Sequence, residues 1–130
     1  MGQHRADLSI RARSQLDAGM PLALSSDRPV VPGPPLLGIQ SFVERRSEEG
    51  RVYGEHVRIT VDEAVHAATV GSATVTGQQA RKGRLVPGQL ADMVFLGAHP
   101  REVASGEIAA IPVRATIAGG GFTHRDPDVG

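Results

Sequence analysis

The chain has 130 residues, with 14 basic residues balanced by 14 acidic ones, no cysteine, 16 glycines and 9 prolines. This length allows one domain with a modest core, and the lack of cysteine excludes disulfides and thiolate metal sites. With no net charge and only three Phe and one Tyr, the sequence offers no surface typical of nucleic-acid binding. No apolar run is long enough for a membrane span or a signal peptide, so we expect a cytoplasmic protein without membrane or nucleic-acid partners.

The chain is predicted to begin with a helix followed by a buried strand. Residues 5–18 place Leu8, Ala12 and Leu16 at helical spacing, and Gly19 stands where a C-terminal cap is expected. The apolar stretch over about residues 20–25 then predicts a strand that is covered on both faces. A helix and a buried strand joined by a tight turn are typical of an α/β unit.

Two further helices are expected after a proline-rich loop. The first covers about residues 36–46 and leads into the charged run at 44–49, which we expect to be a solvated face. The second covers about residues 61–75 and begins with a capping-box pattern, Thr60 followed by Glu63.

The second half of the chain is predicted to be rich in turns and strands. A β-run at 91–96 follows the turn pairs Lys82-Gly83 and Pro87-Gly88. Another strand is expected at 113–118, and the glycines at 119–121 predict a hairpin turn after it. The predicted organisation is therefore an α/β part at 1–76, a β part at 77–124 and a disordered tail at 125–130.

Four blocks of this sequence carry a resemblance to a known family. They are "LDAGMPLALSSDRPVVPGPPLLGI", "ITVDEAVHAATVGSA", "KGRLVPGQLADMVFLGAHP" and "VRATIAGG", which together cover roughly residues 11–122. In order and spacing these blocks resemble the C-terminal end of the metal-dependent amidohydrolases, in the amidohydrolase-3 branch that includes D-aminoacylases and N-substituted formamide deformylases.

The resemblance implies an α/β fold that this chain contains only in part. In that family a TIM-type (β/α)8 barrel holds one or two divalent metal ions, and a small β-sandwich is built from both chain termini. Residues 1–76 would be the last strand-helix portion of the barrel, with strand eight at about 20–25. Residues 77–124 would be the C-terminal strands of the sandwich. Because a barrel takes about 250 residues, the expected fold is incomplete.

The resemblance also implies a role for the acid that follows the predicted strand. Asp27 would be the terminal metal-site aspartate, acting both as a metal ligand and as the general acid/base. In the intact family a divalent metal, most often zinc, activates the water that attacks the amide carbonyl. Ser25, Ser26 and Arg28 are weaker candidates for hydrogen bonds around the site. Without the four blocks, an aspartate at this place would be read as an ordinary turn former.

The other metal ligands of the family are missing from this sequence. No two of its histidines have His-x-His spacing; they are His4, His56, His66, His99 and His124. A catalytic zinc site typically has three protein ligands, and this chain offers one. We therefore expect a C-terminal fragment of a hydrolase acting on non-peptide C–N bonds, inactive and free of metal by itself, arising from a truncated gene, a misassigned start or a split protein.

Two alternatives remain open from the sequence. The chain could be a small non-catalytic β-rich interaction or structural module, or one half of a split amidohydrolase completed in trans. The partners expected are a small amide-type substrate for the intact family, a complementing N-terminal half, or a second copy bound through exposed strand edges.

Overall fold

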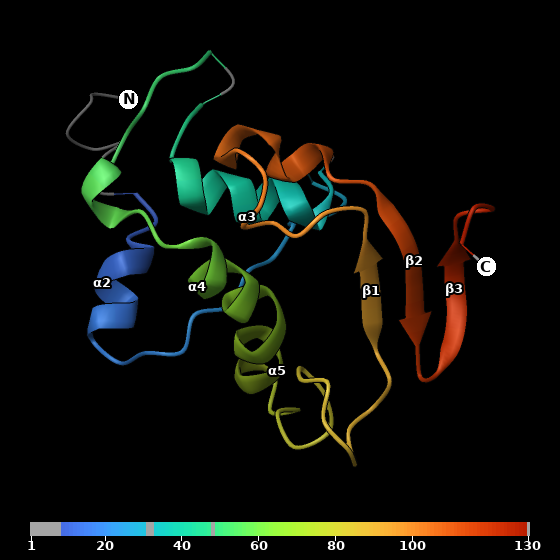
Figure 1. Ribbon diagram of the computed structural model, residues 1–130. Coiled ribbons are helices and arrows are strands. Elements are labelled where there is room, and N and C mark those ends of the chain that lie inside the picture. The colour runs from blue at the N-terminus through green and yellow to red at the C-terminus, as the bar shows by residue number, and fades with distance from the viewer. Residues whose placement is uncertain (1–8, 31–32, 48, 130) are drawn as a thin grey trace.

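The computed structural model describes residues 9–30, 33–47 and 49–129. A helical part formed by the first half of the chain lies beside a three-stranded sheet formed by the last third (Figure 1). Residues 5–8 of the first predicted helix lie outside the described residues. The chain therefore changes from helices to strands along its length, as the sequence predicts.

The first described helix, α2 (Ala12–Asp17), is shorter than predicted. Ile10 has a φ of 49°, a left-handed conformation that a right-handed helix cannot contain. At the other end the prediction is confirmed, because Gly19 has a φ of 70°. Its N–H donates to the Leu16 carbonyl at 2.9 Å, and the Met20 N–H donates to the Gln15 carbonyl at 3.0 Å. These two bonds form a Schellman motif, which ends the helix and turns the chain sharply.

The strand predicted at about residues 20–25 is not formed in the structure. Residues 20–27 belong to no helix or strand. A strand requires a neighbouring strand for its backbone hydrogen bonds, and in the described part of the chain a helix occupies this position. Leu24 donates its N–H to the carbonyl of Ala67 in that helix, at 3.3 Å.

The two later helices are confirmed, with small changes in their bounds. Helix α3 (Pro35–Glu44) has a proline in its first turn, where a missing N–H costs nothing. It ends at Glu44, because the next residue adopts a left-handed conformation with a φ of 52°. After a short 3-10 turn, η1 (Glu55–Val57), a continuous helical path follows. It consists of α4 (Val61–His66), the π turn η2 (Ala67–Gly71) and α5 (Ser72–Val75).

The charged run at 44–49, predicted from the sequence to be a solvated face, is not uniformly exposed in the structure. Arg45 is only 3% exposed. Its guanidinium lies over the Tyr53 ring, 4.9 Å from the centroid, and donates from Nη2 to the Ser9 carbonyl at 2.7 Å. An aromatic face and a carbonyl can accommodate a buried guanidinium, so Arg45 holds the start of the described chain against the loop after α3.

The sheet is antiparallel, with strand order β1-β2-β3. Its strands are β1 (Met93–Leu96), β2 (Val113–Ala118) and β3 (Gly121–Arg125). The predicted hairpin turn is confirmed, because Gly119 and Gly120 connect β2 to β3 with φ values of 57° and 85°. Two positive φ values in succession favour glycine at both positions and match the twist of the two strands.

Residues 125–129, part of the tail predicted to be disordered, make specific contacts in the structure. Arg125 is the last residue of β3, and Asp126 follows it with its N–H donating to the Arg114 carbonyl at 2.7 Å. The Asp126 carboxylate pairs with Arg114 at 2.8 Å, and Val129 closes a turn onto Asp126. Residues 125–129 are therefore held to β2 by backbone and side-chain contacts.

The core lies between the helices and the turn η3 (Ser105–Ala110), which packs against α3. Its buried members come from both halves of the chain: Ala12, Leu22, Leu36, Ile39, Ile59, Ala64, Ala67, Ile108 and Ile111. Ile108 is fully buried, so the loop between β1 and β2 fills the centre of the helical part. This core includes Leu22 and thereby fixes the start of the segment that carries Asp27.

Candidate functional site

Asp27 lies in a turn at the end of the segment from residue 20. Its φ is 54°, which is uncommon for a residue other than glycine. Its N–H donates to Oγ of Ser25 at 3.2 Å, and its carbonyl accepts from the Val30 N–H at 2.9 Å. The Asp27 side chain is exposed. The turn therefore leaves the carboxylate accessible from solvent.

The other three residues predicted around the site differ in their exposure and in their hydrogen bonds to Asp27. Ser25 contacts Asp27 through the backbone bond just described. Arg28 is exposed and precedes Pro29 through a cis peptide bond. Ser26 is half-buried. Of these three residues, only Ser25 has a side chain that forms a hydrogen bond with Asp27.

The segment before Asp27 is held by the π turn of the long helical path. Leu22 is buried, and its carbonyl faces Gly71 so closely that a Cβ built on this glycine would lie 1.9 Å from the oxygen. Two residues further on, the Leu24 N–H donates to the Ala67 carbonyl, and Oγ of Ser72 lies 3.3 Å from the Leu24 carbonyl. The sequence predicted the helix but not this contact.

The described residues do not form a metal centre around Asp27. Within residues 9–30, 33–47 and 49–129, no group of three or more His, Cys, Asp or Glu side chains is placed to hold a metal ion. The histidines are dispersed over separate elements: His56 in η1, His66 at the end of α4, His99 in the loop after β1 and His124 in β3. His4 lies outside the described residues. A single exposed carboxylate does not fit a catalytic zinc site, which uses three protein ligands.

The acidic residues nearest to His66 have structural partners. His66 lines a cavity of about 730 Å³ together with Asp62 and Glu63. Asp62 pairs with Arg101. Glu63 accepts the Thr60 N–H at 2.8 Å and pairs with Arg13 at 2.8 Å, so it closes the predicted capping box. These interactions are consistent with stabilising α4 rather than with holding a ligand.

The environment of Glu63 favours its ionised form. The hydrogen bond from the Thr60 backbone N–H, followed by that from Arg13, lowers the pKa of this carboxyl below its ordinary value, although partial burial opposes the shift. Glu63 therefore remains charged at neutral pH and keeps both contacts.

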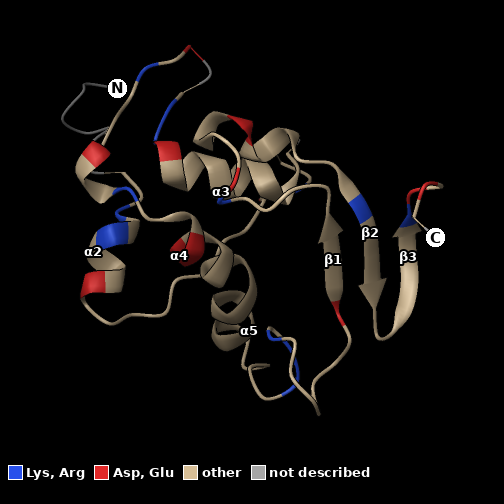
Figure 2. Ribbon diagram, in the orientation of Figure 1, with Lys and Arg blue, Asp and Glu red and all other residues tan. Residues whose placement is uncertain are grey.

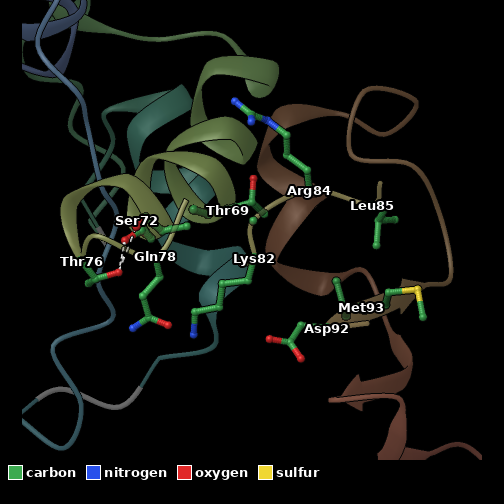
Figure 3. A pocket seen from close by; sticks show the side chains of 13 residues that line it. Thr69, Ser72, Thr76, Gln78, Lys82, Arg84, Leu85, Asp92 and Met93 are labelled. Atoms are coloured by element: carbon green, nitrogen blue, oxygen red, sulfur yellow. Dashed lines mark hydrogen bonds between the residues drawn. The ribbon is translucent and has the colours of Figure 1, made fainter. Parts of the chain in front are cut away.

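A second cavity, of about 480 Å³, lies between the helical path and the segment that leads into β1 (Figure 3). Gln78 and Lys82 line one part of it and Asp92 another, and Ser72 lies on its helical wall. Asp92 is engaged in the fold, because its Oδ1 accepts the Gly119 N–H at 2.8 Å. Gly83 adopts a φ of 104° in the predicted Lys82-Gly83 turn. The lining of the cavity is mostly apolar, and among the described residues it includes no group of three or more side chains that could hold a metal ion.

Comparison with known proteins assigns the class. Residues 1–124 match the model of the Amidohydrolase family, so the chain belongs to that family. It is 29% identical over 127 residues to the Bacillus subtilis (strain 168) protein named "Putative amidohydrolase YtcJ", covering 95% of this chain and 24% of that protein. It is 30% identical over 108 residues to the N-substituted formamide deformylase of Arthrobacter pascens, covering 83% of this chain and 20% of the relative.

A solved structure shares the fold. The crystal structure of an amidohydrolase from Thermotoga maritima MSB8 superimposes with a TM-score of 0.61 at 21% identity, covering 85% of this chain and 24% of the other. The resemblance found in the sequence blocks is thus confirmed at the level of the family. The chain spans about a fifth to a quarter of the length of these proteins. In the described part of the chain, no helix is both long and apolar enough to cross a membrane.

Proposed function

We propose that this chain is the C-terminal portion of a metal-dependent hydrolase that acts on non-peptide C–N bonds. The observation that carries the proposal is the family match over residues 1–124, which includes the segment ending at Asp27. The similarity to a protein named for hydrolysis of N-substituted formamides supports an amide-type small molecule as the substrate.

In this proposal Asp27 provides one ligand, or the carboxylate that handles the proton, for a site completed by other segments. Its exposure and its outward turn suit such a shared site. Zinc is the metal we propose for the complete enzyme. Because the described residues offer Asp27 without further ligands, the 130-residue chain is proposed to be inactive and free of metal when alone.

The partner that we propose is a polypeptide carrying the remaining ligands. The sheet supports such an association, since large apolar side chains are exposed on it: Val94, Phe95 and Phe122 are 55%, 47% and 55% exposed. Its strands carry few charges, with Arg114 on β2 and Arg125 on β3 (Figure 2). Exposed apolar surface of this kind marks places where another chain, or a second copy of this one, could bind.

A chimeric enzyme tests the function. In the Arthrobacter pascens deformylase, the segment that matches this chain would be replaced by this chain, with and without Asp27→Asn. We expect the unchanged chimera to bind zinc and to hydrolyse N-substituted formamide, and the Asp27→Asn chimera to lose at least about a hundredfold in kcat, as is usual when a metal ligand or proton-transfer group is removed. Ser41→Ala, an exposed change in α3, serves as the control.

A folded, metal-loaded chimera that keeps its full rate with Asp27→Asn would contradict the proposed role.

A non-catalytic β-rich module is the second candidate function, and one observation favours it, the hydrogen-bonded sheet at 93–125. Expression of residues 77–129 alone tests it. A cooperative thermal transition would support an independent module, and an aggregating product would count against it.

A further inference from the structure

The helical path changes its hydrogen-bonding pattern where it contacts the segment leading to Asp27. The five-residue π turn Ala67–Gly71 interrupts the α-helical path between α4 and α5. A π turn moves the backbone bond from the fourth to the fifth residue, and such turns are frequent at functional sites. Here the Ala67 carbonyl accepts the Leu24 N–H at 3.3 Å. The turn thus supplies an acceptor to a segment that has no neighbouring strand in the described part of the chain.

Ser72 provides the complementary contact. Its Oγ lies 3.3 Å from the Leu24 carbonyl and 2.9 Å from the Ala67 carbonyl, and one hydroxyl proton can serve one of them at a time. The N–H and the carbonyl of Leu24 are therefore both within reach of the same turn of helix. This arrangement fixes the peptide plane on either side of Leu24.

Gly71 permits the close approach on which these contacts depend. A Cβ at this position would lie 1.9 Å from the Leu22 oxygen and 3.1 Å from the Leu22 carbonyl carbon. Both are backbone atoms of a buried residue, so they cannot move aside as the end of a side chain would. Any larger residue at 71 would push the segment away from the helix.

The fixed part of the segment is connected to Asp27 by two residues. Ser25 follows Leu24 directly, and its Oγ accepts the Asp27 N–H at 3.2 Å. Asp27 has a left-handed φ of 54°, a conformation that is unfavourable for a residue other than glycine and persists where its surroundings impose it. The orientation of the carboxylate thus depends on where the helix holds Leu24.

We infer that Gly71 and Ser72 are positioning residues for Asp27, acting through the backbone of residues 22–24. The positions of these residues rest on the contacts above, whereas the catalytic role of Asp27 rests on the proposed function. Within the described residues, the π turn and Ser72 provide the backbone contacts of Leu24.

The test uses Ser72→Ala in the full chain. Loss of the hydroxyl removes its contact with the Leu24 carbonyl, so residues 22–24 should separate from the helix more easily. Amide hydrogen exchange at Leu24 should then be about tenfold faster, the effect of roughly one hydrogen bond on local opening, and the residual dipolar couplings of Asp27 should change. Ser41→Ala is the matched control, because Ser41 also bonds its own helix, through Oγ to the Leu37 carbonyl, but lies outside this contact. Ser72→Thr keeps the hydroxyl and should restore both values. Unchanged Leu24 exchange and Asp27 couplings in Ser72→Ala would overturn the inference.

A second readout separates this inference from the proposed function. In the chimera, Ser72→Ala should lower kcat by about tenfold and leave KM unchanged, since it disturbs the orientation of a reacting group rather than substrate binding. If Ser72→Ala moves Asp27 but Asp27→Asn keeps full activity, the proposed function fails and the positioning stands. If Asp27→Asn abolishes activity while Ser72→Ala leaves kcat and the couplings unchanged, the positioning fails. Gly71→Ala should displace residues 22–24 further than Ser72→Ala does, because its Cβ would clash with the Leu22 carbonyl. If the Gly71→Ala protein does not fold, the Ser72 variants alone test the inference.

Discussion

Glu63 caps the start of α4 and also connects this helix to α2. Its carboxylate accepts the Thr60 N–H and pairs with Arg13, whose guanidinium also reaches Asp17 at 3.0 Å. The first of these contacts completes a cap and the second ties two helices that are distant in sequence. The lowered pKa of Glu63 is the electrostatic consequence, and it makes part of the protein's stability dependent on pH.

Stability should therefore fall on acidification through the titration of Glu63. Because its pKa in the folded protein is below the unfolded value of 4.5, its contribution is present above that value and is lost as the pH falls through the folded pKa. We expect Glu63→Gln to lower the free energy of unfolding by about 1 kcal/mol at pH 7, and by less in acid. Urea unfolding at several pH values measures this difference. Glu102→Gln, at an exposed position, is the control, and a difference that does not shrink in acid would contradict the assignment.

Residues whose partners are near in sequence were the ones that could be predicted. The capping box needs only Thr60 and Glu63 at their spacing, so its signal is local and the structure confirms it. The burial of Arg45 has no local signal, because it depends on Tyr53 and on the carbonyl of Ser9. In the candidate site, the position of Asp27 after an apolar run was visible, whereas its contact with the helix through Leu24 depends on residues more than forty positions away.

At the scale of elements, the later helices and the hairpin predicted from the sequence are present, but the strand predicted at 20–25 is not formed. Helices satisfy their own backbone groups, so α3 and the path from Val61 to Val75 form wherever their apolar faces are covered. A strand depends on a partner strand, and the described chain provides a helix at that place. The π turn could not be predicted, because no local residue pattern marks it and its neighbour Leu22 is distant in sequence from Gly71.

The hairpin between β2 and β3 gives a prediction for an element. Gly120 has a φ of 85°, and Gly120→Ala should lower the free energy of unfolding by about 1 kcal/mol or more, because an alanine is strained there. Gly38→Ala is the matched control. Gly38 lies inside α3, and a Cβ there meets nothing within 4 Å, so this change should raise stability by up to about 1 kcal/mol. Urea unfolding of both variants would test this, and equal signs would contradict the turn geometry.

At the scale of the whole molecule, a folded core coexists with exposed apolar surface on the sheet. The core draws on both halves of the chain, from Ala12 to Ile111, while large apolar side chains remain exposed on the sheet. The chain spans about a fifth to a quarter of its relatives' length, and its described residues form no group of three or more side chains that could hold a metal ion. The family could be predicted from the blocks of sequence, because their order and spacing match it. The proposed metal site would require ligands in addition to Asp27.

The measurement that tests this account most directly is a calorimetric titration of the purified 130-residue chain with zinc, for the unchanged protein and for Asp27→Asn. Three protein ligands are typical of a catalytic zinc site, so a chain that offers one of them should bind the ion only weakly, without defined stoichiometry. The two proteins should then give indistinguishable titrations. Tight binding of one zinc ion per chain that Asp27→Asn abolishes would contradict the account, since it would show that the site is complete within this chain.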